Sequence, residues 1–164
     1  QMACGTGKTF VYAMIIRRDM LEHPKGRYVV FVPWADLARQ TATQLASLGL
    51  QVGVVGDGSK QMSGQVLVCI YASTHLLLGS QFRIKIVDEA HHLWDSSSRY
   101  FKYIRRGVVG SLTADFSATF CAQRGIDFRY DWDQGAAEGY VCDFEATLAF
   151  MDGSRCMEQL VQLA

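Results

Sequence analysis

Two short runs of residues carry side chains that could do chemistry on phosphate. The first, Gly5-Thr6-Gly7-Lys8-Thr9, directly precedes a helical pattern. Glycines let successive backbone N–H groups point at phosphate oxygens, while Lys8 reaches the β- and γ-phosphates and the Thr9 hydroxyl binds Mg²⁺. The following helix would aim its positive N-terminal end at the same anion. The strict pattern asks for another glycine where this chain has Met2, and a glycine-rich turn before a helix is the structural alternative.

The second run, Asp-Glu-Ala-His at residues 88–91, follows an apolar segment at 84–87. Carboxylates at the C-terminal end of a buried strand lie where an α/β sheet places ligand chemistry. Asp88 would hold Mg²⁺ through water, and Glu89 could position and deprotonate an attacking water. An acidic helix N-terminus capped by Asp88 is the alternative. Because a phosphate loop lies about eighty residues upstream, we favour the catalytic interpretation.

Strands and helices must alternate to position these two runs. Short apolar runs bounded by turns predict strands, and two longer patterned segments predict helices. The predicted strands are 28–32, 52–55, 66–70, 84–87 and 112–116, and the predicted helices are 9–21 and 35–48. This alternation predicts an α/β fold with a mostly parallel sheet and helices on both faces.

The composition fits one globular domain and excludes several classes of protein. The 164 residues are 49% hydrophobic and 20% charged, with 16 basic and 16 acidic side chains. A formal net charge of zero gives no bulk sign of a nucleic-acid or membrane partner. Five cysteines without a Cys-x-x-Cys pair argue against a disulfide framework and a zinc site, and favour an intracellular location, cytoplasmic or nuclear. No apolar run approaches membrane length, so we expect no membrane partner.

In their order along the chain, these runs resemble the motifs of the first RecA-like domain of superfamily-two helicases and translocases with a DEAH box. Residues 3–9 look like motif I, and residues 88–91 look like motif II. Ser117-Ala118-Thr119 is similar to motif III, although the run 112–114 is a second candidate. The segment from Pro33 to Gln40 is similar to motif Ia, and Tyr71 falls where relatives often carry a Thr-Tyr pair. The continuation after motif II and the segment 136–144 resemble the restriction-enzyme and repair-type branch.

The resemblance implies a function and a role for each matching residue. It implies the nucleotide-binding half of an ATP-dependent DNA helicase or translocase that uses ATP and Mg²⁺, with DNA favoured over RNA as partner. Lys8, Asp88 and Glu89 would be catalytic, and Gly5–Thr9 would bind the nucleotide. The residues that would couple hydrolysis to movement are His91, Ser117, Ala118 and Thr119. The residues that would contact nucleic acid are Pro33, Gln40 and Tyr71.

The same resemblance predicts how the domain is organised. Residues 1–130 would form the RecA-like domain, and residues 131–164 would be a connector toward a second RecA-like domain. Since the chain begins inside motif I, we expect an N-terminally truncated fragment that lacks the strand before the phosphate loop and anchors residues 1–8 poorly. Adenine contacts would lie upstream of Gln1. The second domain would supply an arginine finger, so we expect the isolated fragment to hydrolyse ATP very slowly.

Three other functions remain open from the sequence. The first is a nucleotide-dependent nucleic-acid scaffold that does not unwind, and the second is an RNA helicase. The third is a kinase-like phosphotransferase, which the Asp-Glu-Ala-His run disfavours. The basic and aromatic residues of 99–106 suit a nucleic-acid patch or, in the interpretation that we favour, a solvated helix with a buried aromatic stripe.

Overall fold

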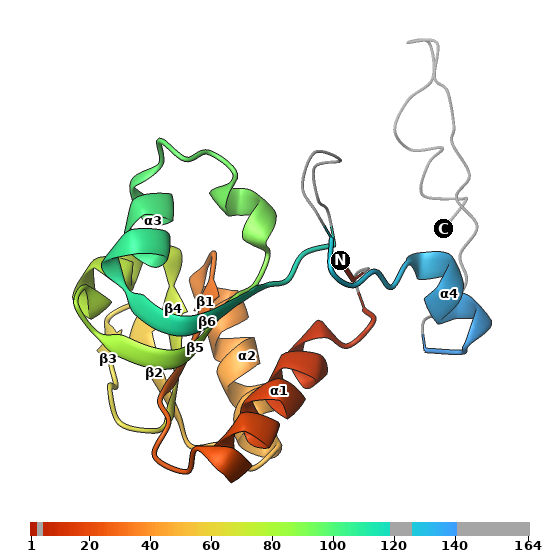
Figure 1. Cartoon of the computed structure of the whole chain (residues 1–164), viewed down its shortest axis with the longest axis horizontal. Helices are drawn as coiled ribbons and strands as arrows, with labels where there is room; N and C mark the ends of the chain where they lie inside the picture. Colours follow the sequence, from red (N-terminus) through yellow and green to blue (C-terminus); the bar gives the residue numbers. More distant parts are fainter. Residues whose placement is uncertain (3–4, 119–125, 141–164) are drawn as a thin grey trace, which may run out of the picture.

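The computed structural model describes residues 1–2, 5–118 and 126–140, which contain a six-stranded sheet (Figure 1). The strands are β1 (Tyr28–Val32), β2 (Val52–Gly56), β3 (Ser59–Lys60), β4 (Val66–Ile70), β5 (Gln81–Val87) and β6 (Val109–Asp115). Their order across the sheet is β3-β2-β4-β1-β5-β6. All neighbours pair in parallel except β2 and β3, which are antiparallel. The carboxyl ends of the parallel strands therefore meet at one edge of the sheet.

Helices cover both faces of this sheet. On one face lie α1 (Lys8–Glu22) and α2 (Ala35–Ser47) (Figure 1). On the other face lie the 3₁₀ helices η1 (Tyr71–Leu77) and η2 (Ala90–Leu93), then α3 (Arg99–Lys102) and the π-helical turn η3 (Tyr103–Gly107). Alternate residues of β1 point into the two layers, and all five residues are fully buried. This two-sided burial explains why β1 has no polar position.

The structure confirms the predicted α/β fold and refines its elements. Strands β1 and β4 have the predicted bounds, whereas β5 and β6 each begin three residues earlier. The two-residue β3 was not predicted. In the stretch 99–107, Tyr100 and Phe101 are partly buried and pack against the core, whereas the predicted helix would bury its aromatic stripe. The helix α4 (Trp132–Ala137) lies inside the predicted connector, whose residues 141–164 are outside the described residues.

The start of the chain is held between the residues that follow β6 and a later segment. The Met2 N–H donates to the Ser117 carbonyl over 3.0 Å, and Met2 forms a parallel bridge with Tyr130. Met2 is buried. The expectation that residues 1–8 are poorly anchored is therefore wrong for Met2, because its backbone pairs on both sides. Among the described residues, no helix combines the length and apolar character needed to cross a bilayer.

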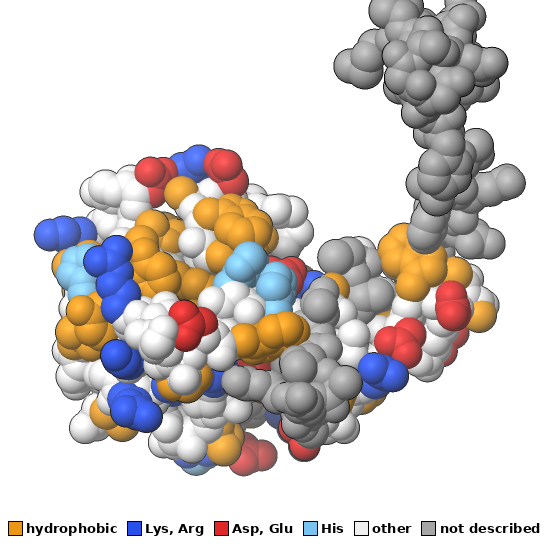
Figure 2. Space-filling model, turned by 90° about the horizontal axis from the view of Figure 1, so that it is seen from above, with side chains coloured by type: hydrophobic (Ala, Val, Ile, Leu, Met, Phe, Trp, Pro, Cys, Tyr) orange, Lys and Arg blue, Asp and Glu red, His pale blue; other side chains and the backbone are white. Residues whose placement is uncertain are grey.

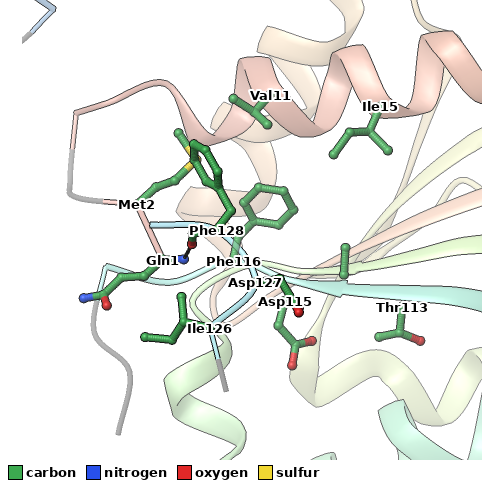
Figure 3. Close-up of a pocket in the computed structure, with 11 residues that line it drawn as sticks. Gln1, Met2, Val11, Ile15, Thr113, Asp115, Phe116, Ile126, Asp127 and Phe128 are labelled. Atoms are coloured by element: carbon green, nitrogen blue, oxygen red, sulfur yellow. Dashed lines mark hydrogen bonds between the residues drawn. The ribbon is translucent and has the colours of Figure 1, made fainter. Parts of the chain in front are cut away.

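A hollow of about 540 Å³ lies between α1 and β6, close to the start of the chain. Figure 3 shows Val11 and Ile15 of α1 on one side of it and Thr113 and Phe116 on the other.

β6 ends the sheet on this side within the described residues, and its Leu112 side chain is 56% exposed. An unpaired strand edge with exposed apolar side chains can pair with other chains.

Candidate nucleotide site

The glycine-rich run forms the turn that leads into α1. Gly5 and Gly7 have φ angles of 77° and 82°, in the left-handed region that glycine adopts without strain. Gly7 is the N-cap of α1, so the helix begins at Lys8, one residue before the predicted start. The cleft beside the turn has a volume of about 450 Å³, and its walls include Gly5, Gly7, Lys8, Thr9 and Gln40. A helix N-terminus under such a turn attracts an anion.

The acidic run begins where β5 ends, at the carboxyl edge of the sheet. The Asp88 N–H donates to the Phe31 carbonyl of β1 over 2.9 Å, so Asp88 continues the sheet. Glu89 then adopts φ 49° and ψ 47°, a left-handed conformation that strains a residue with a side chain. Its N–H donates to the Asp88 carboxylate at 3.0 Å. The left-handed conformation of Glu89 turns the chain, so the consecutive carboxylates of Asp88 and Glu89 lie in different positions.

The side chain of Tyr71 hydrogen-bonds to the backbone of this turn. Its hydroxyl donates to the Asp88 carbonyl over 2.6 Å, and the Glu89 carbonyl lies 3.4 Å away. Burial raises the pKa of this phenol, and the Asp88 carboxylate adds to the rise. The phenol therefore stays protonated and continues to donate its hydrogen bond to the Asp88 carbonyl.

The two runs meet through an ion pair. The Lys8 Nζ lies 3.0 Å from the Glu89 Oε1, and the two side chains are 11% and 19% exposed. The other Glu89 oxygen lies 3.4 Å from the His91 Nδ1. Residues separated by 81 positions in the sequence thus share one mostly shielded site. In this pair the Glu89 carboxylate neutralises the Lys8 ammonium.

Thr9 and Asp88 converge on a residue that the sequence analysis missed. The Tyr12 hydroxyl donates to the Thr9 Oγ1 at 3.2 Å and lies 3.5 Å from the Asp88 Oδ2. Burial raises the Asp88 pKa, and the neighbouring Glu89 carboxylate adds to the rise. Hard oxygen ligands of this kind suit Mg²⁺, which neutralises such a carboxylate. The signal that could have indicated Tyr12 is its spacing of three residues from Thr9, because residues three apart on a helix are neighbours.

Metal binding at this point would need further ligands. Among the residues that the structure describes, no group of three or more His, Cys, Asp or Glu side chains is arranged to hold a metal ion. Mg²⁺ usually keeps several waters and takes the rest of its ligands from one or two protein oxygens and substrate phosphates. Thr9 and Asp88 would supply the one or two protein oxygens of such a site.

Two of the predicted coupling residues, His91 and Ser117, meet beside the acidic run. The His91 Nδ1 lies 2.8 Å from the Ser117 Oγ, and Ser117 is fully buried. Thr113, in the other candidate for motif III, lies within β6, whereas Ser117 follows the strand. The Ala118 carbonyl accepts a hydrogen bond from the Gln1 side chain at 2.7 Å. Thr119 is outside the described residues.

The three predicted nucleic-acid contacts do not lie together. Pro33 directly follows β1 at the carboxyl edge, while Gln40 faces the cleft of the phosphate loop. Tyr71 is 4% exposed and bonded to the acidic run, so its burial argues against a contact with nucleic acid and favours a structural role. Trp34, which lies within the same predicted segment and is half exposed, packs edge-on against His92 with ring centroids 5.5 Å apart. In Figure 2, a pair of histidines lies among hydrophobic side chains on this face.

Comparison with known proteins identifies the family. The family model described as "Type III restriction enzyme, res subunit" matches residues 1–121. The chain belongs to this family. No curated protein matches the chain. The match confirms the predicted resemblance to the restriction-enzyme branch of superfamily two.

Solved structures of low sequence identity share the fold. The Sulfolobus solfataricus SWI2/SNF2 ATPase core in complex with dsDNA has a TM-score of 0.65 at 16% identity, over 73% of this chain and 27% of that one. The nuclease-deletion mutant of the type ISP restriction-modification enzyme LlaGI, in complex with a DNA substrate mimic, has a TM-score of 0.62 at 19% identity, over 85% and 18%. S. cerevisiae Dbp5 bound to RNA and ADP BeF3 has a TM-score of 0.60 at 23% identity, over 74% and 36%.

These comparisons fix the class of the domain. It is a helicase-like ATPase domain of superfamily two with a RecA-like fold, as the motifs predict. The chain spans between 18% and 36% of the length of these three solved proteins.

Proposed function

We propose that the chain is the nucleotide-binding half of an ATP-dependent DNA helicase or translocase. The observation that carries this proposal is that the phosphate loop and the acidic run meet through side-chain contacts. Lys8 of the phosphate loop meets Glu89 at 3.0 Å, and the Tyr12 hydroxyl lies within 3.5 Å of both Thr9 and Asp88. A phosphate-binding cation, two metal-binding oxygens and a candidate base thus share one site.

Each residue has a separate task in the proposed reaction. Lys8 binds the β- and γ-phosphates, and the backbone of residues 5–9 surrounds the phosphate chain. Thr9 and Asp88 would hold Mg²⁺, which would neutralise charge on the phosphates. Glu89 orients the attacking water and accepts its proton on a carboxylate oxygen. For this, Lys8 must leave Glu89 and turn to the phosphates, which frees the carboxylate to act as a base.

Coupling to movement would start at His91. Its bond to Ser117 joins the acidic run to the segment after β6, so a displacement of Glu89 reaches that segment through two side chains. Ala118 and Thr119 follow Ser117 in the same proposed motif. We propose Pro33 as a contact to the nucleic-acid backbone, with Gln40 closer to the nucleotide. Residues 1–130 would be the ATPase domain and 131–164 the connector to a second RecA-like domain that supplies an arginine.

DNA is the proposed partner rather than RNA. The family is that of a restriction-enzyme subunit, and the solved SWI2/SNF2 and LlaGI structures contain DNA or a DNA mimic. The solved Dbp5 structure contains RNA, so the fold by itself serves both.

A binding and turnover experiment tests the proposal. The chain is titrated with Mg-ATP by calorimetry, in parallel with Lys8→Ala, and phosphate release is measured with and without single-stranded DNA or RNA. We expect the chain to bind Mg-ATP and Lys8→Ala to bind at least about tenfold more weakly, since a charge-assisted contact is lost. Turnover by the isolated chain should be very slow, and DNA should accelerate it only when the second domain is present. Equal binding by Lys8→Ala would refute the nucleotide site, and rapid Lys8-dependent turnover by the chain alone would refute the need for a second domain.

A further inference from the structure

A bidentate ion pair joins η3 to the end of β6. The Arg105 guanidinium donates to both oxygens of the Asp115 carboxylate, at 2.8 and 2.6 Å. The two side chains are 21% and 28% exposed, so water reaches the pair only in part. Parallel hydrogen bonds of this kind fix orientation as well as distance, because the planar guanidinium matches the carboxylate. Asp115, the last residue of β6, is therefore held in a defined position.

The Asp115 carboxylate and the Ser117 hydroxyl both reach the layer that contains η2 and η3. Phe116 packs against the opposite layer, and Figure 3 shows its ring on the side of α1 and the Asp115 carboxylate on the other side. Side chains alternate along a strand, so Asp115 faces the layer of η3, where Arg105 holds it. In the same layer, the Ser117 Oγ lies 2.8 Å from the Nδ1 of His91 in η2. Two side-chain contacts, two residues apart, thus hold this segment.

The backbone between these two contacts belongs to the carboxyl edge of the sheet. The Phe116 N–H donates to the Val87 carbonyl at 2.8 Å, and the Phe116 carbonyl accepts from the Ala90 N–H at 2.9 Å. Val87 and Ala90 directly flank the two carboxylates of the acidic run. A shift of the end of β6 would therefore move Ser117 and the acidic run relative to each other.

A buried lysine holds η3 on both sides of Arg105. Lys85 of β5 is 4% exposed, and its ammonium donates to the Ile104 and Val108 carbonyls, both at 2.9 Å. Gly110 of the neighbouring strand makes room for the lysine stem, since a Cβ there would come within 2.6 Å of the Lys85 Cγ. A buried ammonium without acceptors is costly, so this cation keeps the η3 backbone in place. Arg105 therefore extends from a fixed element.

We propose that Arg105 is a positioning residue for coupling, which acts through Asp115 to hold the Ser117 hydroxyl against His91. The inference rests on the proposed function, in which His91 connects the acidic run to the segment after β6. Stability alone does not require the pair, because apolar side chains of similar size often stabilise such a place equally well. The bidentate pair, in contrast, sets the orientation of the strand end. Phosphate binding at Lys8 should not depend on it.

NMR signals of the His91 ring nitrogens, recorded on the free chain, test the positioning. The signals are compared between the wild type, Arg105→Gln and Ser117→Ala, which removes the hydroxyl that His91 contacts. We expect Arg105→Gln to move the His91 signals toward those of Ser117→Ala. Arg105→Lys keeps the charge but not the planar fork, so it should move them less. A role in stability alone would lower Tm and leave these signals in place.

Two further variants keep this comparison decisive. Arg106→Gln is the matched control, because it removes the charge of an exposed neighbouring arginine and should move no His91 signal. If Arg105→Gln does not fold, Asp115→Asn breaks the same pair without leaving a carboxylate unpaired, and it should shift the His91 signals in the same direction. His91 signals at the wild-type positions in the folded variant of the pair would overturn the inference.

Mg-pyrophosphate separates this inference from the proposed nucleotide site. In the wild type we expect its binding to move the signals of His91 and of the Ser117 amide, since Glu89 loses its contact with Lys8. Arg105→Gln should bind Mg-pyrophosphate with unchanged affinity in calorimetry and lose the shift at Ser117. A Ser117 shift that persists in Arg105→Gln would overturn the coupling role of Arg105 alone. Failure of the wild type to bind Mg-pyrophosphate, or equal binding by Lys8→Ala, would overturn the nucleotide site and the coupling role with it.

Discussion

Replacing Glu89 with glutamine should tighten the binding of a polyphosphate to this chain. In the structure, the Lys8 ammonium that would bind phosphate is already paired with the Glu89 carboxylate at 3.0 Å. A phosphate must therefore compete with Glu89 for the same cation. Glutamine keeps the size of the side chain and removes its charge, so Glu89→Gln weakens the competitor and leaves Lys8 in place.

The magnitude follows from the burial of the pair. With side chains only 11% and 19% exposed, the pair is largely shielded from water. A hydrogen bond to a charged group contributes about 1.5–3 kcal/mol, and with glutamine only the Lys8 end of the bond stays charged, which removes roughly half of that contribution. That loss of about 0.8–1.5 kcal/mol corresponds to an increase in affinity of about 4- to 13-fold. Removing the repulsion between Glu89 and phosphate acts in the same direction.

Pyrophosphate titration of the chain in the presence of Mg²⁺ measures this change without any contribution from a base. Asp57→Asn is the matched control, because it changes the net charge equally at an exposed ion pair with Arg39. We expect Asp57→Asn to leave the affinity within about twofold, since exposed pairs contribute little. Unchanged or weaker pyrophosphate binding by Glu89→Gln would show that the Lys8–Glu89 pair does not compete with phosphate.

Three further predictions concern stability and association. Tyr71→Phe removes the hydroxyl bonded to the Asp88 carbonyl and should cost about 1–2 kcal/mol, or about 2–8 °C in Tm, measured by thermal unfolding. Burial by itself raises the Asp19 pKa, but hydrogen bonds from Arg83 and Tyr28 outweigh it and hold the pKa below its usual value. The folded pKa thus lies below the unfolded one, so this stabilisation exists above about pH 4 and is lost as the pH falls through the folded pKa. Asp19→Asn should lower stability by about 1 kcal/mol at pH 7 and converge with the wild type in acid; a pH-independent difference would contradict this. Leu112→Lys on β6, which ends the sheet on one side within the described residues, should reduce self-association in sedimentation experiments without lowering Tm.

The regular elements of the core were predictable because their burial is periodic. β1 and β4 are continuous apolar runs bounded by turns, and their predicted bounds match. The two-residue β3 carries no such pattern, because Ser59 and Lys60 pair only where the chain folds back on β2. The turn η3 is π-helical. The Lys85 ammonium, which is buried in β5, donates hydrogen bonds to the Ile104 and Val108 carbonyls and so holds the chain where η3 ends. That contact joins distant residues and leaves no local signal.

The phosphate loop and the acidic run could be found in the sequence because their chemistry depends on local residue types. Glycines before Lys8 supply left-handed backbone angles, and carboxylates after an apolar strand lie at a sheet edge wherever the strand is buried. The hydrogen bonds of Tyr12 and Tyr71 to the acidic run could not be assigned in this way. A buried tyrosine looks like core in any apolar pattern, and its hydroxyl partner depends on which strand end lies opposite.

The sequence by itself determined the class of the domain and the residue types of its site. Backbone torsion, helix polarity and alternating burial act over a few residues, so they can be read from order and spacing. The tertiary structure decided which of these groups meet. Lys8 pairs with Glu89, and His91 bonds to Ser117. Those contacts depend on the order of strands across the sheet, because parallel pairing brings ends that are distant in the chain to one edge.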